Sequence, residues 1–207
     1  MSRLRIVPIV EGHGETQCVR ILLDRIWREL LGGEHVEVTR PFRWGIGKLV
    51  KKDDVQNAVR TAIKMIAASP STDDPTLVLI LIDADERCPA EWGPKLRSFA
   101  LEANPTVDVA CVLAKYEYET WFAASAESLT KYLEFPDGFV ASEAPEDARL
   151  RKAWVEDFFR GPKYNAPRDQ AGMTHAMDLA LCRKRSPSFA KLCRELERRV
   201  RRPASSA

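Results

Sequence analysis

Apolar strand-like segments alternate with amphipathic helical segments through residues 1–125, and this alternation constrains the fold more than any other feature. Leu4–Val10, Thr76–Ile82 and Val107–Ala114 are short runs rich in Ile, Leu and Val, typical of strands covered on both faces. Thr16–Leu31 and Asp53–Ala68 repeat apolar residues at helical spacing. Because parallel strands need crossover connections, which are usually helices, the pattern predicts an α/β fold with a mainly parallel sheet flanked by helices.

Two more segments complete this predicted unit: a strand over Val36–Phe42 and a helix over Trp92–Ala103. The helix ending near Leu31 is stopped by two glycines. The helix at residues 53–68 is predicted to begin at an Asp53 or Asp54 cap and to end at Ser69-Pro70.

Beyond about residue 125 the strand-like runs disappear. A polar loop at residues 134–145 is followed by three predicted helices, at residues 146–159, 171–183 and 187–201. We therefore predict an α/β core over residues 1–125 and a helical elaboration over residues 126–207 packed on that core as a single compact unit. Residues 203–207 are predicted to fray.

Composition excludes several classes of protein. Hydrophobic residues make up 45% of the chain, which excludes a disordered protein. The 32 basic and 30 acidic residues leave a net charge of +2, which argues against a polybasic nucleic-acid coat. No apolar run approaches the roughly 20 residues that a bilayer span requires. The 5 cysteines have no CxxC spacing, so we expect reduced thiols, no zinc and a cytoplasmic protein.

Acidic residues follow each of the clearest strand-like segments. They are Glu11 after the first segment, Asp83 and Asp85 after the second, and Glu117 and Glu119 after the third. Ligands of open α/β sheets bind at the carboxyl ends of the strands, so these acids are predicted to share one edge.

Several carboxylates without an intervening Lys or Arg repel one another unless a cation joins them. Oxygen ligands are those that Mg²⁺ prefers. Gly12 and Gly14 leave room for a phosphate at the start of the following helix. The sequence therefore predicts a Mg²⁺ site beside a phosphate site, provided that the carboxylates of Glu11, Asp83 and Asp85 converge. The alternative is that these acids serve only as first-turn and strand-end residues.

The motifs Val10-Glu-Gly-His-Gly-Glu15 and Leu81-Ile-Asp-Ala-Asp85 resemble those of the DUF4276 group of TOPRIM-like proteins. Glu117-Tyr-Glu-Thr-Trp-Phe122 and Ser186-Pro-Ser-Phe189 are similar to later segments of that group. The glutamate with the DxD pair is shared by topoisomerases, primases and the nucleases allied to OLD-type ATPases.

The resemblance implies a Mg²⁺- or Mn²⁺-dependent TOPRIM-type nuclease, or another enzyme acting on phosphodiesters. Glu11 would be the general acid/base or a metal-linked glutamate, Asp83 and Asp85 would be metal ligands, and Glu15 would join a second metal position. Glu86, Glu117 and Glu119 are additional candidate acids. No tyrosine occupies the context of a topoisomerase nucleophile. The resemblance also implies an ATPase partner in a prokaryotic defence or repair module.

Nucleic acid is the expected partner, and Lys163 and Arg168 are predicted to contact its phosphates from a Pro-bounded segment. Exposed basic residues of this kind also serve solubility alone. Two other functions stay open. One is phosphoryl transfer or hydrolysis on a nucleotide or small phosphate compound, without a GxxxxGK[ST] loop. The other is a non-catalytic interaction module that retains the fold. The oligomeric state is open as well.

Overall fold

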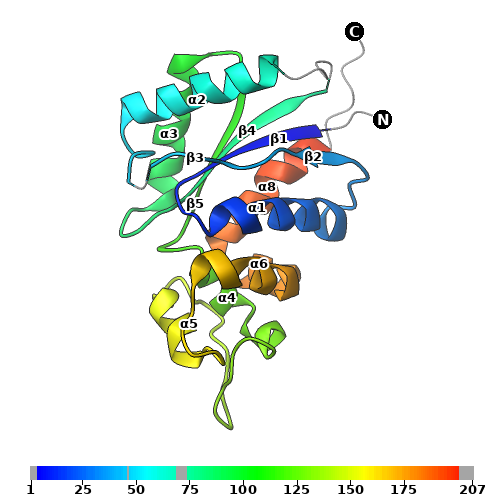
Figure 1. Ribbon diagram of the computed structural model, residues 1–207, viewed down its shortest axis with the longest axis vertical. Helices are drawn as coiled ribbons and strands as arrows, with labels where there is room; N and C mark the ends of the chain where they lie inside the picture. The colour runs from blue at the N-terminus through cyan, green and yellow to red at the C-terminus, as the bar shows by residue number, and fades with distance from the viewer. Residues whose placement is uncertain (1–3, 46, 69–73, 201–207) are drawn as a thin grey trace.

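The computed structural model of the protein describes residues 4–45, 47–68 and 74–200. It confirms the α/β prediction, because these residues form a five-stranded sheet whose strands all pair in parallel (Figure 1). The strands are β1 (Leu4–Val10), β2 (Val36–Val38), β3 (Phe42–Arg43), β4 (Thr76–Asp83) and β5 (Asp108–Ala114). Their order is β2-β1-β4-β5, and β3 also pairs with β1, next to β2. The three strands with the strongest sequence signal therefore lie side by side.

The helices are α1 (Glu15–Arg25) with its π-helical continuation η1 (Ile26–Leu30), α2 (Lys52–Ala67), α3 (Pro89–Ala103), α4 (Glu119–Ala124), the 3₁₀ helix η2 (Ala126–Leu129), α5 (Lys152–Phe158), α6 (Ala166–Ala176), α7 (Leu179–Arg185) and α8 (Pro187–Val200). None of the helices within the described ranges is long and apolar enough to cross a membrane. All five cysteines are free thiols, and only Cys88 is exposed.

Alternate residues of β4 enter two separate hydrophobic clusters on the two faces of the sheet. Leu77, Leu79 and Leu81 pack with α1 and the C-terminal helices, whereas the intervening residues pack with α2 and α3. Figure 1 shows α2 and α3 on one side of the sheet and α1 and α8 on the other. Burial on both faces is the reason that β4 is almost entirely apolar.

Two predictions in the first half of the chain were wrong in detail. The predicted strand at residues 36–42 is two short strands, and Pro41, which has no N–H to donate, lies between them. The cap of α2 is the backbone of Lys51, without a side-chain hydrogen bond. Asp54 lies in the first turn instead, and its Oδ1 accepts a hydrogen bond from Trp44 Nε1 at 3.1 Å. The predicted stop at Ser69-Pro70 lies outside the described residues.

The α3 helix begins at Pro89, three residues before the predicted start at Trp92. Proline at the first helical position is favoured because its missing N–H has no intrahelical partner there. The two predicted C-terminal helices at residues 146–159 and 171–183 also have different bounds. Only α5 forms in the first, and the second is divided between α6 and α7. The division falls at Asp178, whose Oδ1 accepts hydrogen bonds from the first backbone N–H groups of α7.

The C-terminal helices pack on the sheet through α4 and α8. Trp121 is fully buried and its ring lies 5.2 Å from that of Phe189. Glu146 Oε1 accepts hydrogen bonds from Ser188 N (2.9 Å), Ser188 Oγ (2.7 Å) and Ser186 Oγ (2.5 Å) at the start of α8. The Ser-Pro-Ser-Phe segment thus has an observed structural role, since it begins α8 and anchors that helix. Residues 203–207, predicted to fray, lie outside the described ranges.

Candidate functional site

The acidic residues after β1, β4 and β5 gather at the carboxyl edge of the sheet, as their positions in the sequence predict. Asp83 is the last residue of β4, and Glu11 follows β1 directly. Glu15 begins α1, and Glu119 begins α4 just beyond β5. The gathering follows from the parallel pairing of these three adjacent strands.

Asp83 lies at the centre of the group. Burial raises the pKa of its carboxyl well above the usual value, and the charges of Glu15, Glu119 and Glu117 raise it further. The backbone N–H of Tyr118 donates to Asp83 Oδ1 at 2.8 Å, which opposes the rise. No Lys or Arg side chain of the described residues forms an ion pair with Asp83. Within the described ranges, the Asp83 carboxylate therefore has no basic partner to compensate its charge.

Glu15 carries the clearest unsatisfied group of the site. Its Oε2 atom is buried and has no hydrogen-bond partner among the described residues. Burial raises the pKa of Glu15, backbone hydrogen bonds from Glu15 and Gly12 lower it, and the charge of Glu11 raises it. A Cβ at Gly12 would lie 2.1 Å from Glu15 Oε2, so the glycine makes space for this carboxylate. A buried oxygen without a hydrogen-bond donor lowers the stability of the folded protein unless a ligand or an ion binds to it.

Glu11 is held by the loop that follows β3. The backbone N–H of Leu49 donates to Glu11 Oε1 at 3.2 Å. Burial raises the pKa of Glu11, backbone hydrogen bonds from Leu49 and Gly47 lower it, and the charge of Asp85 raises it. The carboxylate is thus partly satisfied and lies close enough to Asp85 for the two charges to interact.

Glu117 and Glu119 already have structural partners. Glu119 is buried, and its Oε1 accepts hydrogen bonds from Tyr164 Oη (3.0 Å) and Gln170 Nε2 (3.1 Å). Glu117 Oε2 accepts from the backbone N–H of Lys152 (2.7 Å) at the start of α5. Both acids therefore tie C-terminal helices to the carboxyl edge, and both still act on Asp83 through their charges.

Asp85 and Glu86 point toward basic side chains. The Asp85 carboxylate is exposed and pairs with Arg87 at 3.0 Å, and the Glu86 carboxylate pairs with Arg151. Among the residues that the structure describes, no three His, Cys, Asp or Glu side chains are arranged as a ready metal-binding group. Glu11, Asp83 and Asp85 thus share one edge of the sheet without forming a complete coordination shell.

The chemistry of the donors nevertheless suits a hard divalent cation. Glu11, Glu15, Asp83 and Asp85 offer only oxygen ligands, and burial has raised the pKa of the first three. The unpartnered Glu15 Oε2 supplies a free oxygen at the same place. A cation would lower these pKa values and remove the repulsion among the carboxylates.

Basic residues that the sequence analysis did not single out surround Tyr116, next to the acids. Lys115 Nζ lies 4.1 Å from the Tyr116 ring centroid, and the guanidinium carbons of Arg151 and Arg149 lie at 4.3 and 5.8 Å. Tyr116 forms a β-bridge with Asp85, and both residues have positive φ angles, of 62° and 48°. We call Lys115, Arg149 and Arg151 the basic cluster. The only sequence signal for its arginines is the short Arg-Leu-Arg-Lys run at residues 149–152, which leads into α5.

The predicted phosphate contacts Lys163 and Arg168 flank Tyr164, the residue that reaches Glu119. Both are exposed. The Arg168 guanidinium binds both carboxylate oxygens of Asp169 and the carbonyl of Lys163, each at 2.7 Å. Gly14 faces Gln170, whose Oε1 would lie 1.9 Å from a Cβ at that position. The observed role of Gly14 is therefore the close approach of α6 to α1.

A parallel α/β sheet that collects carboxylates at its carboxyl edge, with basic side chains beside them, defines the structural class of this protein. The chain belongs to the family described as a domain of unknown function, DUF4276, whose family model matches residues 10–197. The match extends from the end of β1 into α8, so it includes both the sheet and the helices packed on it. No curated protein and no solved structure matches the chain.

Proposed function

We propose that this protein is a Mg²⁺- or Mn²⁺-dependent TOPRIM-type nuclease that cleaves phosphodiester bonds of nucleic acid. The observation that carries the proposal is the buried, unpartnered Glu15 Oε2 beside Asp83 and Glu11, whose pKa values are all raised. Folded proteins rarely retain such uncompensated acids without a function for them.

Asp83, Glu11 and Asp85 would hold the cation, and Glu15 would contribute to a second position. Asp85 would exchange its contact with Arg87 for the cation, which its exposed position allows. A bound divalent cation activates a water molecule as the nucleophile and neutralises charge on the phosphate and leaving oxygen.

The protein groups around this position would orient the substrate and move its protons. The backbone N–H of Tyr118 fixes the Asp83 carboxylate. If Asp83 and Asp85 alone hold the cation, Glu11 would instead serve as the general acid or base, because burial raises its pKa and so favours proton transfer. The basic cluster at Tyr116 would attract the phosphate backbone to the adjacent acids.

Plasmid and single-stranded DNA incubated with Mg²⁺ or Mn²⁺ should be cleaved by the wild-type protein. Asp83→Ala and Glu11→Ala should lower the rate by about 100-fold or more, because each removes a carboxylate from the reacting centre. Glu102→Ala is the matched control, since Glu102 is an exposed acid on α3 that pairs with Lys52. Equal cleavage by the wild type and both site variants would refute the assignment.

Two further measurements distinguish the nuclease from the other proposed functions. Hydrolysis of nucleotides without cleavage of DNA or RNA would assign the site to small phosphate compounds. Cation binding measured by calorimetry, without turnover by the isolated chain, would favour an interaction module or an enzyme that needs a partner. An ATPase is the partner that we propose in that case.

The basic cluster makes a second prediction, about binding. The Arg149→Gln/Arg151→Gln variant should bind a fluorescent single-stranded oligonucleotide more weakly in EDTA. The magnitude of its slope of log affinity against log salt concentration should fall by about 1–2. Each phosphate contact that is lost means that fewer counterions are released on binding. The Lys163→Gln/Arg168→Gln variant tests the other predicted contacts. One arginine of each pair already has an acidic partner, Glu86 for Arg151 and Asp169 for Arg168, so the two slopes show which pair contacts phosphate. An unchanged slope in the first variant would exclude the basic cluster as a phosphate site.

A further inference from the structure

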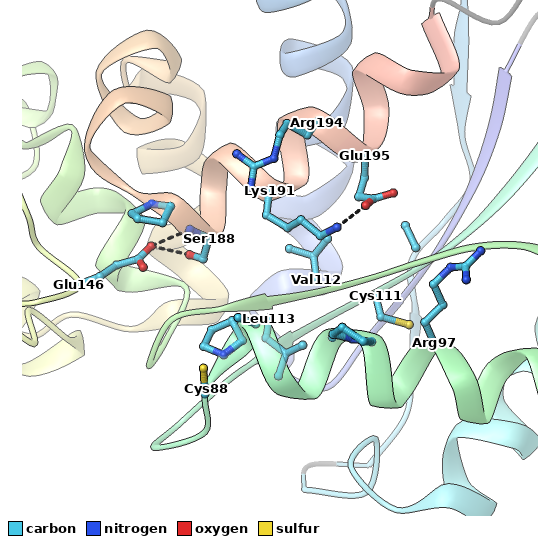
Figure 2. A pocket seen from close by; sticks show the side chains of 16 residues that line it. Cys88, Arg97, Cys111, Val112, Leu113, Glu146, Ser188, Lys191, Arg194 and Glu195 are labelled. Carbon is cyan, nitrogen blue, oxygen red and sulfur yellow. Dashed lines mark hydrogen bonds and ion pairs between the residues drawn. The ribbon is translucent and has the colours of Figure 1, made fainter.

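A groove of about 570 Å³ lies along the outer edge of β5, away from the acidic site (Figure 2). Residues of α3 line one wall, residues of α8 line the other, and Ala110–Leu113 of β5 form the floor. The two helices cover opposite faces of the sheet, so the groove opens where the sheet itself ends.

The backbone of β5 is unpaired along this groove. Among the described residues, β5 pairs with β4 alone. The Ala114 carbonyl accepts a hydrogen bond from Ala84 N at 2.8 Å, so Ala114 faces the β4 side. Because successive residues of a strand present their backbone groups to alternate sides, Cys111 and Leu113 present theirs to the groove. The position of the Cys111 carbonyl, 3.4 Å from a Cβ at Gly93 of α3, agrees with this direction.

Small side chains lie on both walls of the groove. The α3 side carries the small side chains of Ala90, Gly93 and Pro94, and the α8 side begins with Pro187 and Ser188. The edge of β5 is recessed between the two helices, and therefore a single strand can reach it more readily than the edge of another folded sheet. Cys111 and Leu113 are only 5% and 2% exposed, so an added strand would have to enter between α3 and α8. An unpaired strand edge is a template for strand addition.

The charges of the groove favour an acidic occupant. Arg97 and Arg194 line it, both are exposed, and neither forms an ion pair or hydrogen bond within the described residues. Lys191 and Arg97 also act on the Cys111 thiol at the floor, opposing the burial that raises its pKa to about 12. The Glu195 carboxylate pairs with Lys191, whereas the Glu146 carboxylate accepts hydrogen bonds from Ser188 and keeps its charge, so the two arginines outnumber one acid without an ion pair. Two arginines thus remain to meet negative charge.

We propose that this groove binds an extended acidic segment of a partner protein, which adds to β5 as a further strand. Backbone hydrogen bonds to Cys111 and Leu113 hold the segment, and Arg97 and Arg194 select its acidic side chains. The site is separate from the acidic edge and does not depend on the nuclease proposal.

The probe is the fluorescein-labelled peptide acetyl-Glu-Val-Asp-Val-Glu-Val-amide, followed by fluorescence anisotropy. We expect saturable binding, weakened at least about 10-fold in Arg97→Glu/Arg194→Glu, since two attractive charges become repulsive. Arg60→Glu/Lys64→Glu is the matched control, because it reverses two exposed charges on α2 and leaves the groove intact. Melting curves of both variants establish that they are folded.

Three further measurements separate strand addition from other kinds of binding. The same peptide with alternate amides N-methylated should fail to bind, and equal binding would overturn the proposal in favour of charge attraction alone. Hydrogen exchange at Cys111 and Leu113 should slow with the peptide, and unchanged exchange would also overturn it. Acetyl-glutamate binding as tightly as the peptide would assign the groove to small anions, and a dimer that protects the same amides without peptide would assign it to a second copy of the chain.

Discussion

Asp83→Asn should abolish cation-dependent turnover and, in the absence of the cation, raise the melting temperature. The variant keeps the oxygen that accepts from Tyr118 N but removes a buried charge that no Lys or Arg of the described residues pairs with. A gain of about 1 kcal/mol would raise the melting temperature of a chain of this size by about 2–4 °C. The residue that the proposed chemistry needs is thus expected to cost stability when the site is empty of substrate and cation.

The expected difference in melting temperature between Asp83→Asn and the wild type depends on pH. The folded-state pKa of Asp83 is raised, so the folded protein holds a proton that the unfolded chain releases from about pH 3.9 upward. Its contribution to stability is complete below that pH and is lost as the pH rises through the raised pKa. The melting temperature of Asp83→Asn should therefore exceed that of the wild type by a larger margin at about pH 8 than at about pH 5.

Differential scanning calorimetry with and without Mg²⁺ measures both effects. Mg²⁺ should stabilise the wild type at neutral pH and leave Asp83→Asn unchanged. Asp157→Asn is the matched control, because Asp157 is an exposed aspartate of α5 outside the acidic site. A variant that melts below the wild type at every pH would show that the Asp83 charge is compensated in the folded protein.

Trp121→Ala should destabilise the protein by about 3–5 kcal/mol, the usual cost of removing a large buried ring. Trp121 is fully buried, its ring lies 5.0 Å from that of Tyr118, and its Nε1 donates to Ser188 Oγ at 2.9 Å. The substitution leaves a cavity where α4 meets α8. Urea unfolding followed by far-UV circular dichroism measures the loss.

Two other tryptophan variants show which contacts matter. Trp121→Phe keeps most of the buried ring and removes the hydrogen bond, so we expect a loss of about 1 kcal/mol. Trp92→Ala removes a partly exposed ring that lies 4.2 Å from Lys95 Nζ, and it should cost less than Trp121→Ala. Similar losses for Trp92→Ala and Trp121→Ala would mean that the contacts of Trp121 with α8 stabilise the protein no more than the partly exposed ring of Trp92 does.

Local patterns were enough to predict much of the fold. β1, β4 and β5 could be predicted because strands buried on both faces must be apolar throughout. Their parallel pairing then placed Glu11, Asp83 and Glu119 at one edge. The break between β2 and β3 was missed, although Pro41 marks it in the sequence. Helix ends in the C-terminal half were also missed. Asp178 lies inside a continuous helical pattern, and its role as a cap becomes evident only from the backbone N–H of Ala180 that donates to it.

The sequence by itself determined the α/β class and the edge at which the acids gather, since both depend on periodicity and on where strands end. Only the tertiary structure decided what each acid does there. It brought Tyr164 and Gln170 to Glu119, left Glu15 Oε2 without a partner and placed Arg149 and Arg151 against Tyr116. These are contacts between segments distant in the chain. The local conformational preferences of a sequence do not describe such contacts. The open groove on β5 has the same origin, because an edge exists only once the strands have been ordered.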